Sequence, residues 1–160
     1  MYLYTIEVDN KSQKVISLLS PQQIEGEKLA SQCILGTLKN SNSEDDSINL
    51  ENFFPNSQFI NFFHSLIAKF APYSHSLNAE AKRQKKGWVY IIDGRCANPR
   101  GNILPEDIIG AFKVDNSEII LDSYQRNNNH LIYSQKGFFK LEPTLQKHLV
   151  EETQKLIKEV

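Results

Sequence analysis

A stripe of large apolar side chains, repeated at the spacing of an α-helix, most constrains how this chain can fold. The stripe consists of Phe59, Phe62, Phe63, Leu66, Ile67 and Phe70. Side chains three and four residues apart lie on one face of a helix, so this spacing predicts an amphipathic helix. Asn56 or Ser57 is available as its N-cap, and Pro72 marks its end. Because a helix of this length depends on tertiary packing, we expect the stripe to be buried.

The N-terminal segment has the period of two that is typical of a half-buried β-strand. Every second residue from Tyr2 to Val8 is apolar. Two further strand-like runs follow at residues 15–19 and 32–38, with a loop or a weak helix expected at 21–27. These three runs predict an antiparallel unit.

Strand-like runs also dominate the second half of the chain. Residues 88–93 are aromatic and β-branched on both faces, which predicts a central strand. Residues 108–114 and 118–124 flank the polar turn Asp115-Asn116-Ser117, the signal of a hairpin. Two more short strands are expected at 131–133 and 138–141. The pattern as a whole predicts a meander.

The last segment of the chain returns to helical spacing. Leu145, Leu149, Thr153, Leu156 and Ile157 fall on one helical face. We expect this helix to pack across the meander and cover one face of its sheet. The predicted fold class is therefore α+β: a mainly antiparallel sheet, made of the N-terminal strands plus a C-terminal meander, packed with two amphipathic helices. Neither an internal repeat nor a parallel βαβ alternation is present.

Length and composition are those of an ordinary globular domain. The 160 residues are 40% hydrophobic and 23% charged, so we expect one domain over residues 1–160. Residues 39–49 are rich in Ser, Asn and acidic side chains and predict a mobile surface loop. No signal-like segment or membrane-span run occurs, and Cys33 and Cys96 are too few for a disulfide framework. These features predict a cytoplasmic protein that does not enter a membrane.

The balance of charge argues against a general affinity for polyanions. The chain has 18 Lys and Arg against 19 Asp and Glu. The local basic segment at residues 82–86, followed by Trp88 and Tyr90, does combine basic and aromatic residues as nucleic-acid surfaces do. However, we expect the basic residues to form a solvated helix face and the two aromatic residues to pack in the sheet. Nucleic-acid binding through this segment is therefore the weakest of the functional hypotheses.

The densest group of polar residues lies in the loop 93–107, directly after the expected central strand. Asp93 could bind a cation or orient a base there. Arg95 and Arg100 could bind a phosphate or a carboxylate through their forked donors. The alternative is structural: Asp93 forms a turn with Gly94, and the arginines pair with Glu106 or Asp107.

A second polar loop, at residues 123–130, contains His130 close in sequence to Arg126 and Tyr124. Histidine titrates near neutral pH, and Arg126 could stabilise a developing anion. If the two loops converge, His130, Arg126 and Asp93 would suit a small hydrolase or nuclease. Tyr124 joins Arg95 and Arg100 as a candidate ligand-binding residue. The structural alternative is that the Asn-rich sequence simply forms turns.

No pattern in the sequence predicts a metal or a cofactor. His64 and His75 lack the spacing of metal ligands, and we expect His64 to lie on the helix surface. Gly94 and Gly101 form no phosphate-binding pattern.

Since no motif names a reaction, the leading hypothesis is a binding or regulatory module that recognises another protein. The sheet face, or the loops at its edge, would provide the contact surface. The hydrolase hypothesis is the runner-up, and the oligomeric state is left open.

Overall fold

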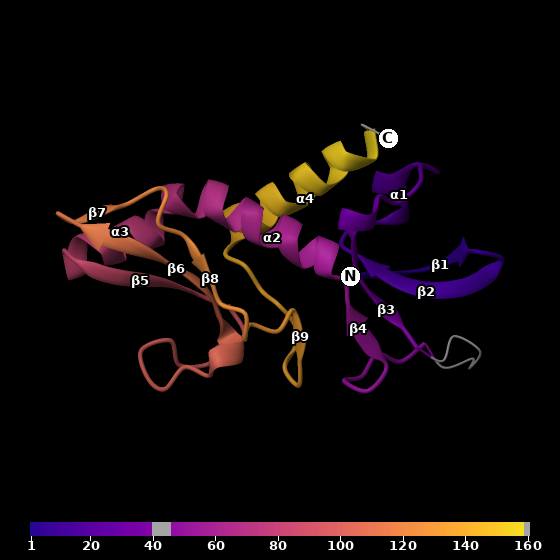
Figure 1. Ribbon diagram of the computed structural model, residues 1–160, viewed down its shortest axis with the longest axis horizontal. Coiled ribbons are helices and arrows are strands. Elements are labelled where there is room, and N and C mark those ends of the chain that lie inside the picture. The colour runs from indigo at the N-terminus through magenta and orange to yellow at the C-terminus, as the bar shows by residue number, and fades with distance from the viewer. Residues whose placement is uncertain (40–45, 159–160) are drawn as a thin grey trace. The chain divides into compact units, whose positions relative to one another are not determined.

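The computed structural model describes residues 1–39 and 46–158 and confirms the α+β class, with antiparallel sheets and helices (Figure 1). The chain divides into two compact units. We call residues 1–63 and 149–160 the terminal unit, and residues 64–148 the central unit. Helices α2 (Ser57–Phe70) and α4 (Pro143–Lys158) each begin in one unit and end in the other. The expectation of a single domain over residues 1–160 stays a prediction.

The terminal unit contains a four-stranded antiparallel sheet in the order β1-β2-β3-β4. Its strands are β1 (Tyr2–Val8), β2 (Lys11–Ser17), β3 (Ile34–Leu38) and β4 (Phe53–Pro55). Asp9 and Asn10 connect β1 to β2 with φ angles of 51° and 62°. Positive φ at both central residues is what a tight hairpin turn requires, so these two residue types suit the position.

Two segments of the terminal unit refine the sequence-based boundaries. Strand β2 starts at Lys11 rather than Val15, because its polar half pairs with the exposed end of β1. The short helix α1 (Pro21–Ile24) begins at a capping box formed by Ser20 and Gln23. Residues 40–45 of the expected mobile loop lie outside the described residues. Residues 46–49 form neither helix nor strand.

The C-terminal helix corrects one expectation about packing. Ile157 on α4 is buried in a cluster with Leu19, Ile24 and Cys33. The second half of α4 therefore packs on the N-terminal segment, whereas the sequence predicted that it would cover the meander. Burial in this cluster raises the pKa of the Cys33 thiol to about 11. Cys33 is thus a small apolar core residue.

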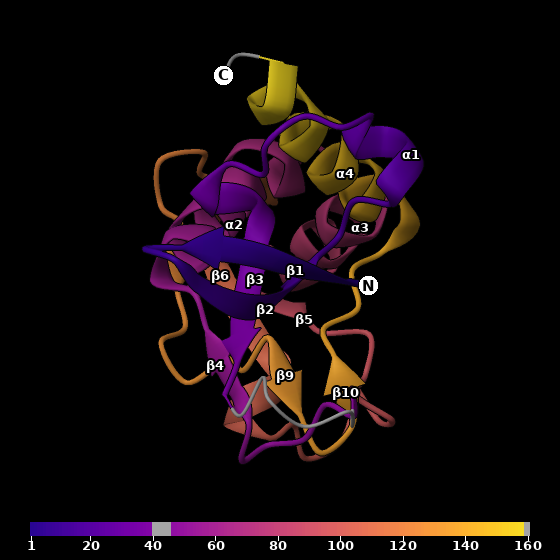
Figure 2. The same cartoon turned by 90° about the vertical axis from the view of Figure 1, so that its right-hand side faces the viewer.

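The central unit is built on a second antiparallel sheet, in which β5, β6 and β7 are neighbours and β8 pairs with β6 (Figure 1). A separate hairpin pairs β9 with β10, and both strands are labelled in Figure 2. The remaining elements are α3 (His75–Gln84), β5 (Gly87–Ile92), β6 (Ile108–Asp115), β7 (Glu118–Ile119), β8 (Gln125–Arg126), β9 (Tyr133–Ser134) and β10 (Gly137–Phe138). Short 3-10 turns cover Ser31–Cys33, Ala71–Tyr73 and Pro105–Asp107. Asn116 and Ser117 both have positive φ, which confirms the predicted turn between β6 and β7. Strand β7, however, covers only Glu118–Ile119 rather than the expected 118–124.

Strand β5 lies at an edge of this sheet, and the expectation of a central strand is wrong. Among the described strands, β6 is its only neighbour. Val89 and Ile91 are buried, whereas Trp88 is 36% and Tyr90 is 53% exposed. The alternation arises because helix α3 packs against β5. The expectation that Trp88 and Tyr90 pack in the sheet core is therefore also wrong.

Helix α2 confirms the predicted amphipathic helix, with one refinement. Phe59, Phe63, Leu66 and Ile67 are buried, but Phe62 and Phe70 are only partly buried. Asn56 provides the cap, since its side-chain oxygen accepts a hydrogen bond from the Gln58 amide at 3.1 Å. In the central unit, the ring of Phe70 stacks on His148 with 4.0 Å between ring centroids.

Truncating the best-buried phenylalanine of the stripe should destabilise the protein strongly. We expect Phe63→Ala to lower the free energy of unfolding by about 3–5 kcal/mol, because a fully buried ring leaves a cavity. Tyr73, which is 76% exposed, provides the control, and Tyr73→Ala should cost below about 1 kcal/mol. Urea unfolding of both variants measures the difference. Equal losses would show that Phe63 does not act as a core residue.

Candidate functional site

Asp93 and Arg95 form a buried ion pair at the end of β5. The Asp93 amide donates to the Asp107 carbonyl oxygen at 2.7 Å, which anchors this end of the strand to the start of β6. Arg95 then binds the Asp93 carboxylate with both sides of its guanidinium: Nε donates to Oδ1 at 3.1 Å and Nη2 to Oδ2 at 2.9 Å. The two side chains are 1% exposed or less. This is the bidentate geometry that arginine forms with carboxylates.

The rest of the Arg95 guanidinium binds the segment 131–137. Nη1 donates to Ser134 Oγ at 3.0 Å and to the Gly137 carbonyl at 2.8 Å. Nη2 also donates to the Leu131 carbonyl at 2.5 Å. Each of the five N–H groups of the guanidinium therefore has an acceptor inside the protein. A ligand-binding role for Arg95 stays a prediction, and any ligand would compete with these contacts.

Asp93 also orients His130. The Nε2 atom of His130 lies 2.9 Å from Asp93 Oδ2, and the His130 side chain is 1% exposed. The Lys140 amide donates to Oδ1 at 3.0 Å. Burial by itself raises the pKa of Asp93, but the hydrogen bonds from His130, Arg95 and Lys140 outweigh it. The pKa of this carboxyl consequently lies below its ordinary value.

A second buried histidine lies near His130. His64 Nδ1 is 2.6 Å from the Tyr124 hydroxyl oxygen, and His64 is only 6% exposed. The expectation that His64 lies on the helix surface is therefore wrong. Burial, together with the nearby Arg126 and His130, lowers the pKa of His64 to about 4. Burial also raises the pKa of Tyr124 far above its ordinary value, so both groups are uncharged at neutral pH.

The tight fit around Tyr124 explains why a glycine faces it. A Cβ atom added at Gly110 would lie 2.6 Å from the Tyr124 ring and 2.7 Å from its hydroxyl oxygen. Gly110 is thus required for Tyr124 to reach His64 across β6.

The predicted loops do converge, but into the interior. Asp93 and His130 are in contact, and Arg95 joins them. Tyr124 contacts His64, whose pKa is lowered in part by the nearby Arg126 and His130, but the Arg126 side chain is exposed. A carboxylate that orients an imidazole is the arrangement of a general base. However, the Asp93 and His130 side chains are both almost fully buried, so a substrate could not reach them in this conformation. We call Asp93, Arg95 and His130, with Ser134, the buried polar cluster.

The structural alternative paired the arginines with Glu106 or Asp107, and for Arg95 it named the wrong acid. Arg95 pairs with Asp93. Asp107 instead forms an ion pair through its Oδ2 atom with the Nζ atom of Lys136. The other carboxylate oxygen of Asp107, Oδ1, is buried and has no hydrogen-bond partner in the described part of the chain. Within the same residues, no group of three or more His, Cys, Asp or Glu side chains is arranged to bind a metal.

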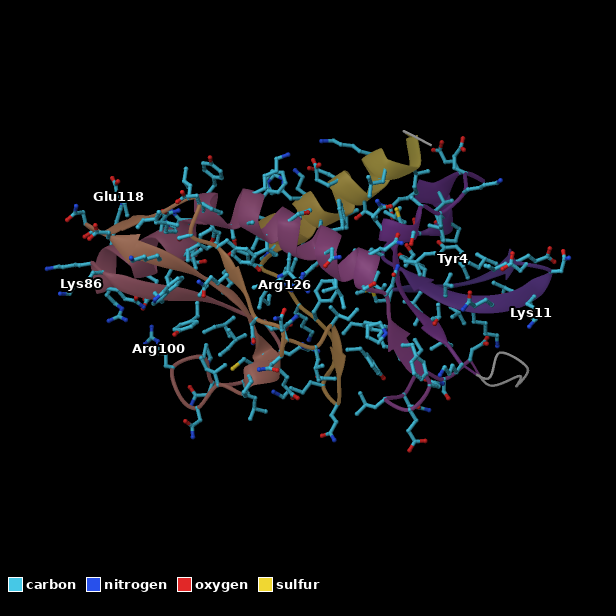
Figure 3. The ribbon with its side chains drawn as sticks, in the orientation of Figure 1. Tyr4, Lys11, Lys86, Arg100, Glu118 and Arg126 are labelled. Carbon is cyan, nitrogen blue, oxygen red and sulfur yellow. The ribbon has the colours of Figure 1, made fainter. Side chains whose placement is uncertain are left out.

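Arg100 lies elsewhere, in a surface groove beside β5. The groove consists of two adjoining cavities that share Glu80, Tyr90, Ile92 and Pro99. One cavity, of about 380 Å³, is mostly apolar; its lining includes Ala71, Leu77, Ile91, Leu141 and Leu145. The other, of about 700 Å³, is lined further by Arg83, Gln84, Arg100 and Ile103. Figure 3 shows Arg100 on the loop that follows β5. We call this region the β5 groove.

Some backbone N–H and C=O groups of β5 point outward from the sheet, on the side of β5 that faces away from β6. Lys113, the cross-strand partner of Trp88, directs its amide to Ser123 Oγ at 2.7 Å and its carbonyl to the Ile120 amide at 2.9 Å. Both bonds lie on the side of β6 away from β5. Trp88 and Lys113 are therefore a non-hydrogen-bonded pair, and the N–H and C=O of Trp88 point outward. By the same alternation, those of Tyr90 point outward as well.

The two units differ in charge. The central unit contains twelve Lys and Arg against eight Asp and Glu, whereas the terminal unit contains six against eleven. The near-zero net charge of the chain thus hides an excess of positive charge in the unit that contains the β5 groove.

Comparison of the chain with protein-family models, curated proteins and solved structures finds no match. In residues 1–39 and 46–158, none of the helices has the length and apolar character needed to cross a bilayer. The geometry of the buried polar cluster and of the β5 groove is therefore the basis for inferring a function.

Sequence reasoning missed several contributors to these sites. His64 shares a helical face with Ile60 and Ile67, and that spacing could have indicated its burial. The carbonyl groups of Leu131 and Gly137 that bind Arg95 left no signal, because every residue has a carbonyl. Glu80 was not singled out, and Arg83 was considered only as part of the basic segment at residues 82–86.

Removing Arg95 should be far more damaging than removing Arg100. Arg95→Ala leaves the Asp93 carboxylate buried without its cation, which should lower the free energy of unfolding by about 3–5 kcal/mol. Arg100→Ala changes an exposed residue of the same loop, and we expect a change within about 0.5 kcal/mol. Thermal and urea unfolding compare the pair. Similar stabilities would contradict a structural role for the buried ion pair.

Stability should fall as the pH drops below the ordinary pKa of histidine, and His64 should be a main cause. Between about pH 6.5 and 4 the unfolded chain binds a proton at residue 64 while the folded protein does not, so protonation favours unfolding. The loss attributable to His64 should approach about 3 kcal/mol. His64→Gln should flatten this part of the stability–pH curve, whereas a change of the exposed His75 to Gln should not. Parallel curves for wild type and His64→Gln would rule out this contribution.

Proposed function

We propose that the protein is a peptide-recognition module, which binds an extended segment of a partner protein along the outer edge of β5. The observation that supports this most directly is the outward direction of the Trp88 and Tyr90 backbone groups. In strand addition, such unpaired N–H and C=O groups provide affinity by hydrogen-bonding the backbone of the added segment. The sequence-based hypothesis placed the contact on the sheet face or on the loops at its edge, whereas this proposal places it on the edge strand β5 itself.

The β5 groove supplies the side-chain contacts that such a module needs. Alternate side chains of an added strand point to opposite faces, so cavities beside the edge select particular residues. The exposed ring of Tyr90 lines both cavities, and aromatic residues are enriched in protein interfaces. An unprotected edge strand is also an aggregation hazard, which natural proteins usually cover. A bound partner segment would provide such a cover.

We further propose that the module acts in the cytoplasm, since Cys33 and Cys96 are both free thiols. The hydrolase hypothesis is the second candidate. The contact between His130 and Asp93 favours it, but the burial of both side chains requires an opening of the central unit before any substrate is reached. We rank it below peptide recognition for that reason.

A proline at position 90 tests strand addition directly. Tyr90→Pro removes an N–H that points away from β6, so the ladder with β6 keeps its hydrogen bonds. Tyr90→Thr also removes the ring but keeps the N–H, and it serves as the matched control. Linear twelve-residue peptides are first selected on the wild-type protein from a random library. We expect Tyr90→Pro to bind them on the order of tenfold more weakly than Tyr90→Thr.

Amide hydrogen exchange provides the second readout. In the wild-type protein, a selected peptide should slow exchange at the Trp88 and Tyr90 amides, because both become hydrogen-bonded. Melting temperatures confirm that the variants are folded. Equal binding by the two variants, or unchanged exchange at both amides, would reject strand addition at β5.

A further inference from the structure

We propose that the segment bound in the β5 groove is acidic, with an aliphatic side chain in the apolar cavity and an Asp or Glu side chain on Arg100. This inference rests on the proposed function and names the chemistry of the partner. Three features of the groove support it: the state of its two arginines, the lining of its apolar part, and the charge around it.

The two arginines of the groove are in different states. Arg83 is bound by Glu80 through two hydrogen bonds, at 2.9 Å from Nε to Oε2 and 2.5 Å from Nη2 to Oε1. Hydrogen bonds from Arg83 and Gln84 lower the pKa of Glu80 to about 2, so this acid keeps its charge at neutral pH. Arg83 is therefore already neutralised by its own helix.

Arg100 has no such partner. In residues 1–39 and 46–158 its guanidinium forms no hydrogen bond, although Glu80 is close enough to feel its charge. The residue is exposed and lies on the lining of the groove. Its forked donors match the two oxygens of a carboxylate, and this geometry favours Arg over Lys for such a role. A carboxylate bound here completes a cluster of two arginines and two acids.

The apolar cavity fits an aliphatic side chain. Ala71, Leu77 and Leu145 are all buried, and they line it together with Ile91 and Leu141. It shares Tyr90 and Ile92 with the cavity that contains Arg100, so one extended segment passing along β5 can occupy both. A small polar feature is also present, where Ser76 donates to Glu142 at 2.8 Å.

The surroundings favour a negatively charged partner. Besides Arg83 and Arg100, exposed lysines lie at the end of α3 and in the turn into β5; they are Lys82, Lys85 and Lys86. A surface with an excess of one sign of charge steers an oppositely charged partner and raises its rate of association.

A peptide fits these observations better than a nucleic acid. The outward backbone groups of β5 match another extended backbone, and an apolar cavity takes a side chain rather than a phosphate. Nevertheless, the exposure of Trp88 and Tyr90 removes the packing argument against base stacking, so an oligonucleotide belongs in the test.

The test uses the full chain and three labelled ten-residue peptides with amidated C-termini. All contain one Leu in a Ser, Thr and Val background, and they differ in having two Glu, two Gln or two Lys residues. We expect the wild-type protein to bind the Glu peptide at least tenfold more tightly than the Gln peptide, and the Lys peptide least. Arg100→Glu should reverse this order. Lys69→Glu, which makes the same charge change on an exposed residue outside the groove, should leave the order unchanged.

Each outcome has a defined meaning. If library-selected peptides bind at β5 but the Glu and Gln peptides bind equally, the acidic preference is wrong while peptide recognition stands. If neither the library nor any designed peptide binds, peptide recognition fails as well. An unamidated Gln peptide that matches the Glu peptide would assign Arg100 to a chain terminus and overturn the side-chain assignment. A ten-nucleotide oligothymidine that binds more tightly than the Glu peptide, and is lost in Arg100→Glu, would replace the peptide with nucleic acid.

Discussion

The buried ion pair between Asp93 and Arg95 holds together three segments of the central unit that are distant in sequence. The Asp93 backbone anchors the end of β5 to the start of β6, and its carboxylate is also in contact with His130. Arg95 binds the segment 131–137 through backbone carbonyl groups. A buried charge is costly unless it is paired and hydrogen-bonded, and here both partners are saturated. The chemistry that made these residues look catalytic in the sequence thus also makes them suitable for cross-linking loops.

That anchoring matters for the surface as well as the interior. Strand β5 ends at the ion pair, and the same loop continues to Arg100 on the wall of the groove. Arg95, which is buried, therefore holds the start of the loop on which the exposed Arg100 lies. Binding sites on loops need such rigid support, because a loop that changes position cannot preserve the geometry of a contact. Within this loop Arg95 therefore has a structural position in a buried ion pair, and Arg100 lies on the lining of the groove.

The buried histidines illustrate how the environment selects a protonation state. His64 keeps no charge near neutral pH because burial, Arg126 and His130 all disfavour its protonated form. Asp93 keeps its charge because the hydrogen bonds around it outweigh the effect of burial. His64 is thus uncharged and Asp93 charged because the groups around them differ. The residue type alone does not determine either protonation state.

By itself, the sequence determined the local structure. The spacing of Phe59, Phe63 and Ile67 specified a helix, the polar turn at 115–117 specified a hairpin, and the alternation in residues 2–8 specified a strand, because each signal depends on near neighbours in the chain. Only the tertiary structure decided which strand lies at an edge, and that Arg95 and Arg100 have different surroundings. Those properties depend on residues far apart in sequence and on backbone groups that every residue shares, so the identity of a single residue does not encode them.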